Sequence, residues 1–232
     1  MSLPAGTVTF VFSDVEGSTE LLKRLGEDYA TVIADHRHIV RESFGAHGGV
    51  EIDSQGDAFF FAFARARDAA TAAVEAQREH AAHTWPNGEH VRVRMGLHTG
   101  EPAVGDEGYL GLDVVRAARI CTVGQGGHVL VSDATRALLG STLPEGVSVH
   151  PMGERRLKDL DEPERVYELV IDGVDQPEPP VAAPDGAPSP VEDDDFDDRI
   201  AQLGERMSAD IKDSVLRRLE QTLGPRGKSP DR

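Results

Sequence analysis

Residues Thr7-Val-Thr-Phe-Val-Phe-Ser-Asp-Val-Glu-Gly-Ser-Thr19 decide the fold, because they join a buried strand to the beginning of a helix. β-Branched and aromatic side chains fill Thr7–Ser13, which is typical of a buried strand. After Asp14 a helical pattern runs from about residue 18 to 44, with apolar residues at three- to four-residue spacing. The Gly48-Gly49 pair then predicts the end of this helix.

Strand and helix patterns alternate through the rest of the first 171 residues. Two strands, at about 50–54 and 58–64, flank Gln55-Gly56-Asp57, whose glycine favours a hairpin turn. The later segments are a helix at 66–83, a strand at 91–97 with one face open to solvent, a helix at 112–122, a strand at 128–132, a short helix from Asp133, and two or three short strands ending at 166–170. This order predicts an α+β fold with a ferredoxin-like βαββαβ core and helices largely on one face of the sheet.

The composition changes after Ile171. Residues 172–196 are rich in Pro, Ala, Gly and acidic side chains, which predicts a flexible linker. Apolar residues then recur at three- to four-residue spacing over 197–223, which predicts an amphipathic helix, followed by a disordered tail at 224–232. We expect this helix either to pack on the first domain or to bind a protein partner or a second copy of the chain.

Charge and composition exclude several classes of protein. The formal net charge is −17, from 24 Lys and Arg against 41 Asp and Glu, which argues against a protein that coats nucleic acid or an anionic membrane. Cys121 is the only cysteine, so a disulfide framework and a cysteine-based zinc site are excluded. The longest apolar stretch, 58–64, is far shorter than a membrane span, and the first residues do not resemble a signal peptide. We therefore expect a soluble, cytoplasmic protein.

Two aspartates mark a candidate site. Asp14 closes the first strand, and Asp57 lies in the turn of the hairpin that we expect to pair beside it. Because neighbouring strands lie about 4.8 Å apart, the two carboxylates can converge on one or two hard divalent cations such as Mg²⁺. The backbone N–H groups of Val15–Thr19, at a helix start, would suit phosphate oxygens. Together these features predict a nucleoside triphosphate site, whereas each aspartate alone could be an ordinary cap or turn residue.

Five segments of the chain carry a resemblance to a known family. They are Thr7–Thr19, Asp53-Ser-Gln-Gly-Asp-Ala-Phe59, Met95-Gly-Leu-His-Thr-Gly100, Val114-Val-Arg-Ala-Ala-Arg-Ile120 and Gly153-Glu-Arg-Arg-Leu-Lys-Asp-Leu160. In this order and spacing they resemble the class III nucleotidyl cyclase homology domain over about residues 6–170. The resemblance implies that a nucleoside triphosphate, ATP by default and GTP as the alternative, is converted to a 3′,5′-cyclic nucleotide and pyrophosphate. It also implies two Mg²⁺ or Mn²⁺ ions per site and a head-to-tail homodimer.

The resemblance also implies roles for individual residues. Asp14 and Asp57 fall on the two metal-binding aspartates of the family, and Arg119 falls on the arginine that stabilises the transition state from the other subunit. The phosphate-binding positions fall on Val15, Glu16, Gly17, Ser18, Thr19 and Lys158.

Three positions depart from the family pattern. Asp53 stands where the family has a base-reading lysine, Gly108 where it has the second base-reading residue, and Val115 where it has the asparagine that orients the ribose. A carboxylate only accepts hydrogen bonds, so Asp53 suits the donors of guanine or indicates relaxed base choice. Loss of the asparagine donor would cost a factor of about 10²–10³ in turnover. The alternative is a catalytically degenerate domain that binds nucleotide or dimerises and thereby regulates a partner.

Overall fold

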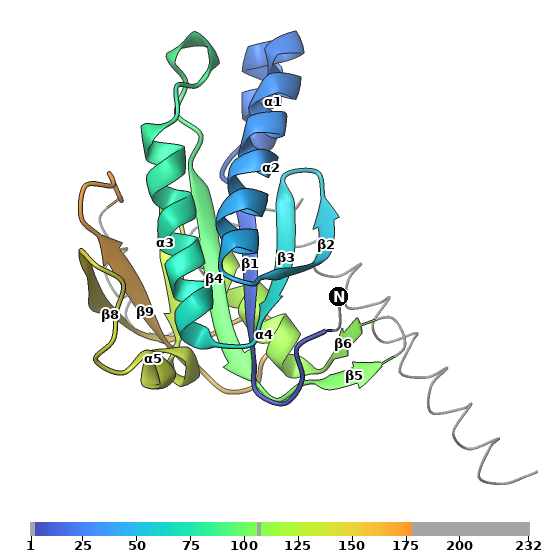
Figure 1. The fold of residues 1–232 in the computed structure, drawn as a ribbon, viewed down its shortest axis with the longest axis vertical. Helices are drawn as coiled ribbons and strands as arrows, with labels where there is room; N and C mark the ends of the chain where they lie inside the picture. The colour runs from blue at the N-terminus through green and yellow to red at the C-terminus, as the bar shows by residue number, and fades with distance from the viewer. Residues whose placement is uncertain (1–2, 106–107, 178–232) are drawn as a thin grey trace, which may run out of the picture.

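The structure is a computed structural model that describes residues 3–105 and 108–177. Its centre is a seven-stranded sheet in the order β2-β3-β1-β4-β7-β9-β8, and β5 pairs separately with β6 (Figure 1). The strands are β1 Val8–Val15, β2 Val50–Gln55, β3 Ala58–Phe63, β4 Val93–Gly100, β5 Ala103–Gly105, β6 Gly108–Leu110, β7 Val129–Ser132, β8 Val147–Arg155 and β9 Glu164–Ile171. The α-helices are α1 Ser18–Leu25, α2 Tyr29–Ala46, α3 Ala66–Ala82, α4 Leu112–Thr122 and α5 Asp133–Leu139, with 3₁₀ turns η1 Gly26–Asp28 and η2 Pro86–Gly88.

The first four sheet strands form the expected ferredoxin-like core. β3 and β4 flank β1, both antiparallel to it, and β2 pairs antiparallel with β3 at the sheet edge. β7 extends the sheet parallel to β4, and β9 and β8 follow in antiparallel order. The α+β prediction is therefore confirmed, and the predicted hairpin is the β2–β3 pair.

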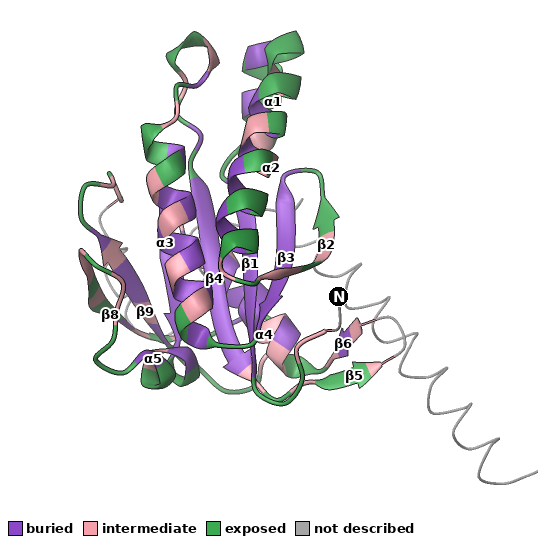
Figure 2. Cartoon of the chain, viewed as in Figure 1, coloured by how far each residue is buried: buried purple, intermediate pink, exposed green. Residues whose placement is uncertain are grey.

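Helices cover both faces of the sheet. Alternate residues of β3 point to opposite faces: Phe59 belongs to the core under α2 and α3, whereas Phe60 belongs to the core under α4. In Figure 1, α2 and α3 lie in front of the sheet and α4 lies behind it, and Figure 2 shows the central strands buried. The expectation that helices lie largely on one face thus holds for α2 and α3 but not for α4.

Two sequence predictions need correction in the first half of the chain. The single helix expected over 18–44 is two helices, because Gly26 adopts a φ of 55° that ends α1 before α2 begins at Tyr29. The predicted solvent face of the strand at 91–97 is also wrong. Arg94 is 1% exposed, since β4 lies inside the sheet and this side chain has a charged partner on β1.

The C-terminal predictions lie mostly outside the described residues. These are the linker beyond residue 177, the helix at 197–223 and the tail at 224–232. The first linker residues lie against the domain, where the Gln176 side chain donates to the Gly127 carbonyl at 3.1 Å and accepts from the Ile171 N–H at 2.7 Å. Among the residues that the structure describes, no helix has the length and apolar character to cross a membrane.

Candidate functional site

The structure brings Asp14 and Asp57 together at one end of the sheet. Ser13 of β1 lies opposite Phe59 of β3, so the residue after Ser13 reaches the level of the β2–β3 turn. The Asp57 carboxylate accepts the Val15 N–H at 3.2 Å. Asp14 is 2% exposed and Asp57 is 3% exposed. Asp57 thus reaches the backbone next to Asp14, and convergence of the two carboxylates on one cation stays a prediction.

Arg94 is a residue of this site that sequence reasoning missed. Its Nη2 and Nε donate to Oδ2 of Asp14 at 2.6 and 3.1 Å, and Asp14 lies directly opposite it across β1 and β4. A charge this deeply buried is costly unless it is paired. The sequence signal was a charged residue inside an otherwise apolar strand, which the alternating pattern had assigned to solvent.

The donor set fits a hard divalent cation in part. Carboxylate oxygens are the ligands that Mg²⁺ and Mn²⁺ prefer, and Asp14 and Asp57 would each offer one carboxylate at this end of the sheet. Among the described residues, no cluster of three or more acidic, His or Cys side chains could hold a metal by itself. The protein would therefore supply two carboxylates, and the triphosphate and water would supply the remaining ligands, as is usual for Mg²⁺ at phosphate sites.

The predicted phosphate loop, Val15–Thr19, connects β1 to α1. Its Val15 N–H donates to Asp57, and its Glu16 N–H donates to the Arg92 carbonyl at 2.9 Å, so these two donors already have acceptors within the protein. Gly17 precedes α1 with a φ of 63°, a left-handed conformation that glycine adopts without strain. The N-terminal turn of α1, which begins at Ser18, remains the part of the loop best suited to an anion.

Arg119 lies on α4, on the opposite face of the sheet from α2. Gly96 of β4 allows this helix to approach, because a Cβ there would lie 2.2 Å from the Cys121 backbone nitrogen. The Arg119 side chain is 4% exposed, and its Nη2 donates to Oδ2 of Asp159. Asp159 follows the exposed Lys158 in the β8–β9 loop and has a φ of 66°. The structure thus places the predicted transition-state arginine beside the loop of the predicted phosphate-binding lysine.

The base- and ribose-reading positions lie on three different elements. Asp53 is half-buried on β2, opposite Phe60, and therefore lies on the α4 face of the sheet. Gly108 begins β6, and Val115 is half-buried on α4, one turn before Arg119. Their roles stay predictions.

His98 of β4 connects to residues of α4 and β7. Its Nε2 donates to the Asp113 carboxylate at 3.2 Å, and its Nδ1 lies 2.8 Å from the Ser132 hydroxyl oxygen. The hydrogen bond from His98 lowers the pKa of Asp113 below its usual value. Ser132 is completely buried and accepts the Thr135 N–H at the start of α5, so this Ser-His-Asp chain joins α4 and α5 to β4 and is no nucleophilic triad.

Comparisons with known proteins assign the family. The profile described as "Adenylate and Guanylate cyclase catalytic domain" matches residues 2–170. An uncharacterized protein of Mycobacterium tuberculosis is 38% identical over 81% of this chain and 64% of its own length, so the chain spans less than two thirds of that relative. An adenylate cyclase of Podospora anserina is 28% identical over 72% of this chain and 10% of its own.

Solved cyclase structures share the fold. A structure from a study of adenylate cyclases of Trypanosoma brucei in their monomeric state has a TM-score of 0.67 and 25% identity, over 75% of this chain and 94% of the other. The guanylate cyclase domain of RhGC from Catenaria anguillulae, solved with GTP, has a TM-score of 0.62 and 20% identity, over 72% of this chain and 97% of the other. The chain belongs to the class III adenylate/guanylate cyclase catalytic domain family.

Proposed function

We propose that this protein is a cytoplasmic nucleotidyl cyclase that converts a nucleoside triphosphate to a 3′,5′-cyclic nucleotide and pyrophosphate at a head-to-tail homodimer interface. The observation that supports the proposal is the burial of two aspartates, Asp14 and Asp57, at one end of the sheet, where the Asp57 carboxylate accepts the N–H of Val15, the residue after Asp14. Burying an ionised carboxylate costs free energy unless another charge, a metal ion or hydrogen bonds compensate it. Membership of the cyclase family supports a metal-binding role for this pair.

Each proposed site residue has a distinct role in the reaction. The ribose 3′-oxygen attacks the α-phosphorus, and the bond to the bridging oxygen of the β-phosphate breaks. Two Mg²⁺ or Mn²⁺ ions held by Asp14 and Asp57 would supply activation of the 3′-oxygen and neutralisation of the triphosphate. Arg119 of the other subunit would stabilise the charge that develops at the α-phosphate. Lys158 and the Val15–Thr19 loop would bind the remaining phosphates.

We take ATP as the default substrate, and a substitution of Asp53 tests whether this residue determines the preference for adenine or guanine. A carboxylate accepts hydrogen bonds from guanine but meets only acceptors at the ring nitrogens of adenine. Replacing Asp53 by Lys should therefore shift the ratio of kcat/KM for ATP to that for GTP towards ATP. An unchanged ratio would exclude a base-reading role for this position.

The activity itself is tested with the purified chain, Mn²⁺ and either ATP or GTP. We expect cyclic nucleotide from the wild type and none from Asp57→Ala, because the variant lacks one of the two metal-binding carboxylates. Asp68→Ala, on the first turn of α3, is the matched control and should keep the activity. Cyclic product that persists in Asp57→Ala would contradict the proposal.

The second candidate is a non-catalytic module that binds nucleotide or dimerises and regulates a partner, for example through the segment at 197–223. Two internal ion pairs favour it: Arg94 already binds Asp14, and Asp159 already binds Arg119. Val115 also favours it, because valine cannot donate the hydrogen bond that the family asparagine would give to the ribose. Binding of ATP or GTP without turnover in the assay above would support this second candidate.

A further inference from the structure

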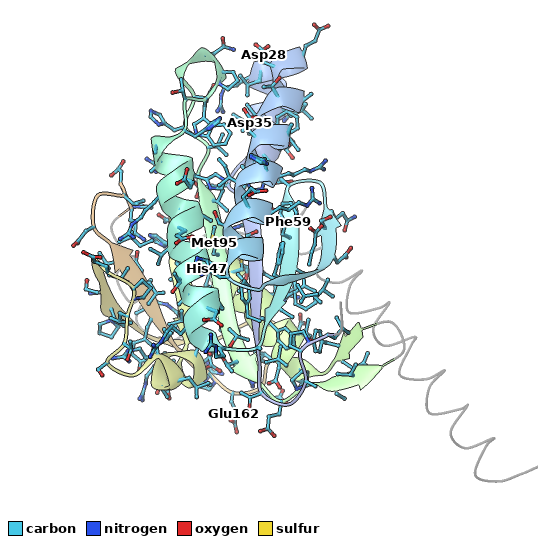
Figure 3. The ribbon with its side chains drawn as sticks, viewed as in Figure 1. Asp28, Asp35, His47, Phe59, Met95 and Glu162 are labelled. Atoms are coloured by element: carbon cyan, nitrogen blue, oxygen red, sulfur yellow. The ribbon has the colours of Figure 1, made fainter. Side chains whose placement is uncertain are left out.

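Two consecutive residues of α2 hold the turn that contains Asp57. Arg37 donates from Nε and Nη2 to the Gly56 carbonyl at 3.0 and 2.6 Å. His36 Nε2 lies 2.9 Å from the Asp57 carbonyl, and the ring nitrogen must donate because a carbonyl oxygen only accepts. Figure 3 shows Phe59, two residues after Asp57, between α2 and the β2–β3 hairpin. The helix therefore bonds to both carbonyl groups that flank the Asp57 Cα.

These contacts determine where the Asp57 side chain points. Each peptide group is planar, so fixing the carbonyls of Gly56 and Asp57 fixes the two planes that meet at the Asp57 Cα. The direction of the Cα–Cβ bond follows from those two planes. On the other side, the carboxylate accepts the Val15 N–H of β1 at 3.2 Å. Asp57 is thus held from α2 through its backbone and from β1 through its side chain.

His36 is itself held rigidly. It is completely buried, its Nδ1 lies 2.9 Å from Nε2 of His80, and its ring lies 5.8 Å from that of Phe59 between centroids. His80 Nδ1 lies 2.7 Å from the Ala76 carbonyl, and the Trp85 indole donates to the His80 carbonyl at 3.1 Å. The two imidazoles therefore bridge the Asp57 turn to the backbone of α3. A surface turn would need no such support.

We infer that Arg37 and His36 are positioning residues that orient Asp57 for metal binding. The inference rests on the proposed function and deepens it, because it assigns α2 a part in the metal site. Outer residues that orient a metal ligand typically change metal affinity by about 10–100-fold when they are replaced. Arg37 is the more useful of the two to replace, since it is only half-buried, whereas His36 lies in the core.

Arg41 provides a matched control on the same helix. It donates to Glu51 on β2 through Nε and Nη2, both at 2.8 Å, and its guanidinium lies over Phe59. Arg41 and Arg37 thus both connect α2 to the β2–β3 hairpin, but only Arg37 bonds to the turn. A general loosening of the hairpin would affect both variants, whereas a loss of Asp57 orientation would affect only Arg37.

The test measures Mn²⁺-dependent binding of 3′-deoxy-ATP and 3′-deoxy-GTP, which lack the attacking hydroxyl, to the full chain. We expect Arg37→Gln to raise the Mn²⁺ concentration at half-saturation by about 10-fold. Arg37→Lys, which keeps one donor for the Gly56 carbonyl, should fall between Arg37→Gln and the wild type, and Arg41→Gln should match the wild type. The midpoint of thermal unfolding, measured in parallel, shows whether each variant is folded.

Two failures are distinguishable. If Arg37→Gln matches Arg41→Gln while wild-type binding needs both Mn²⁺ and Asp57, the positioning role is overturned and the proposed function stands. If wild-type binding needs no Mn²⁺, or if the Mn²⁺ dependence survives Asp57→Ala, the metal site fails and the positioning role fails with it.

Discussion

Two ion pairs hold residues that the cyclase reaction would need, and they differ in depth. The pair between Arg94 and Asp14 joins neighbouring strands, with side chains 1% and 2% exposed. The pair between Arg119 and Asp159 joins α4 to a loop, and the Asp159 side chain is 56% exposed. Both members of the first pair are buried in the sheet, whereas in the second pair Arg119 is buried and only Asp159 lies at the surface, where water can solvate it.

This difference separates what the fold requires from what the reaction would require. Removing one member of a buried pair leaves the other charge buried and unpaired, which is strongly destabilising. Removing Arg119 from the second pair leaves only the exposed Asp159, whose charge water and salt can screen, so this loss costs little. Arg119 can therefore exchange Asp159 for a phosphate at small cost, while Asp14 and Arg94 hold their end of the sheet together.

The largest expected effect is on stability. Replacing Arg94 by Met should lower the free energy of unfolding by about 3–5 kcal/mol, because the buried Asp14 carboxylate loses its ion pair with Arg94. Replacing Arg119 by Met leaves an exposed Asp159 and should cost about 1 kcal/mol or less in the ion pair. Urea unfolding of both variants beside the wild type measures the difference. Equal losses would remove the distinction between the two pairs.

The next effect is on turnover, where we expect a large loss from the Arg119 substitution although its effect on stability is small. Arg119→Lys keeps a positive charge but loses the planar, two-pronged donor geometry of arginine. If Arg119 stabilises the transition state, kcat should fall by about 10²–10³-fold, the usual effect of one lost donor. The control is Arg165→Lys, in the exposed pair between Arg165 and Glu154, which should leave kcat unchanged. A kcat within twofold of the wild type in Arg119→Lys would contradict the assignment.

A smaller effect of burial concerns pH. Burial lowers the pKa of His80 to about 3 and lowers that of His36 as well. The neutral rings of His36 and His80 carry one N–H each, but together they make three contacts: with the Asp57 carbonyl, with each other and with the Ala76 carbonyl. One more proton would supply the third N–H, but desolvation of the charged ring opposes its uptake. The unfolded chain takes up this proton below its ordinary pKa of about 6.5 and the folded chain does not, so stability is lost as the pH falls from that value towards 3.

At pH 5 the loss attributable to His80 is on the order of 2 kcal/mol relative to pH 8. Urea unfolding at several pH values measures it. His80→Leu should reduce the pH dependence, whereas His38→Gln, an exposed position on α2, should leave it unchanged. A pH dependence that is the same in His80→Leu and the wild type would show that His80 does not titrate in this way.

Elements with one clear period were predictable from the sequence. The helix at 112–122 begins and ends where predicted. Gly111 lies directly before it, and its apolar residues recur at regular helical spacing. The closeness of the Asp57 turn to the end of β1 could also be predicted, because the strands β1 and β3 pair side by side. The break at Gly26 was missed, since apolar spacing continues through it and only the φ of 55° shows the interruption.

Partners far apart in the sequence were not predictable. Arg94 looks like a solvent-facing residue until its pairing with Asp14 on β1 is known. His36 is similar. It lies at helical spacing from Val32 and Val40, a buried-face position where a polar residue needs a partner, but nothing in the local pattern identifies Asp57 or His80 as that partner.

The most direct test is a crystal structure of the chain with Mn²⁺ and a 3′-deoxynucleoside triphosphate. We expect an anomalous peak for Mn²⁺ within bonding distance of carboxylate oxygens from both Asp14 and Asp57, with phosphate oxygens completing its ligands. A structure in which nucleotide binds but Asp14 and Asp57 lie too far apart to contact the same ion would contradict it.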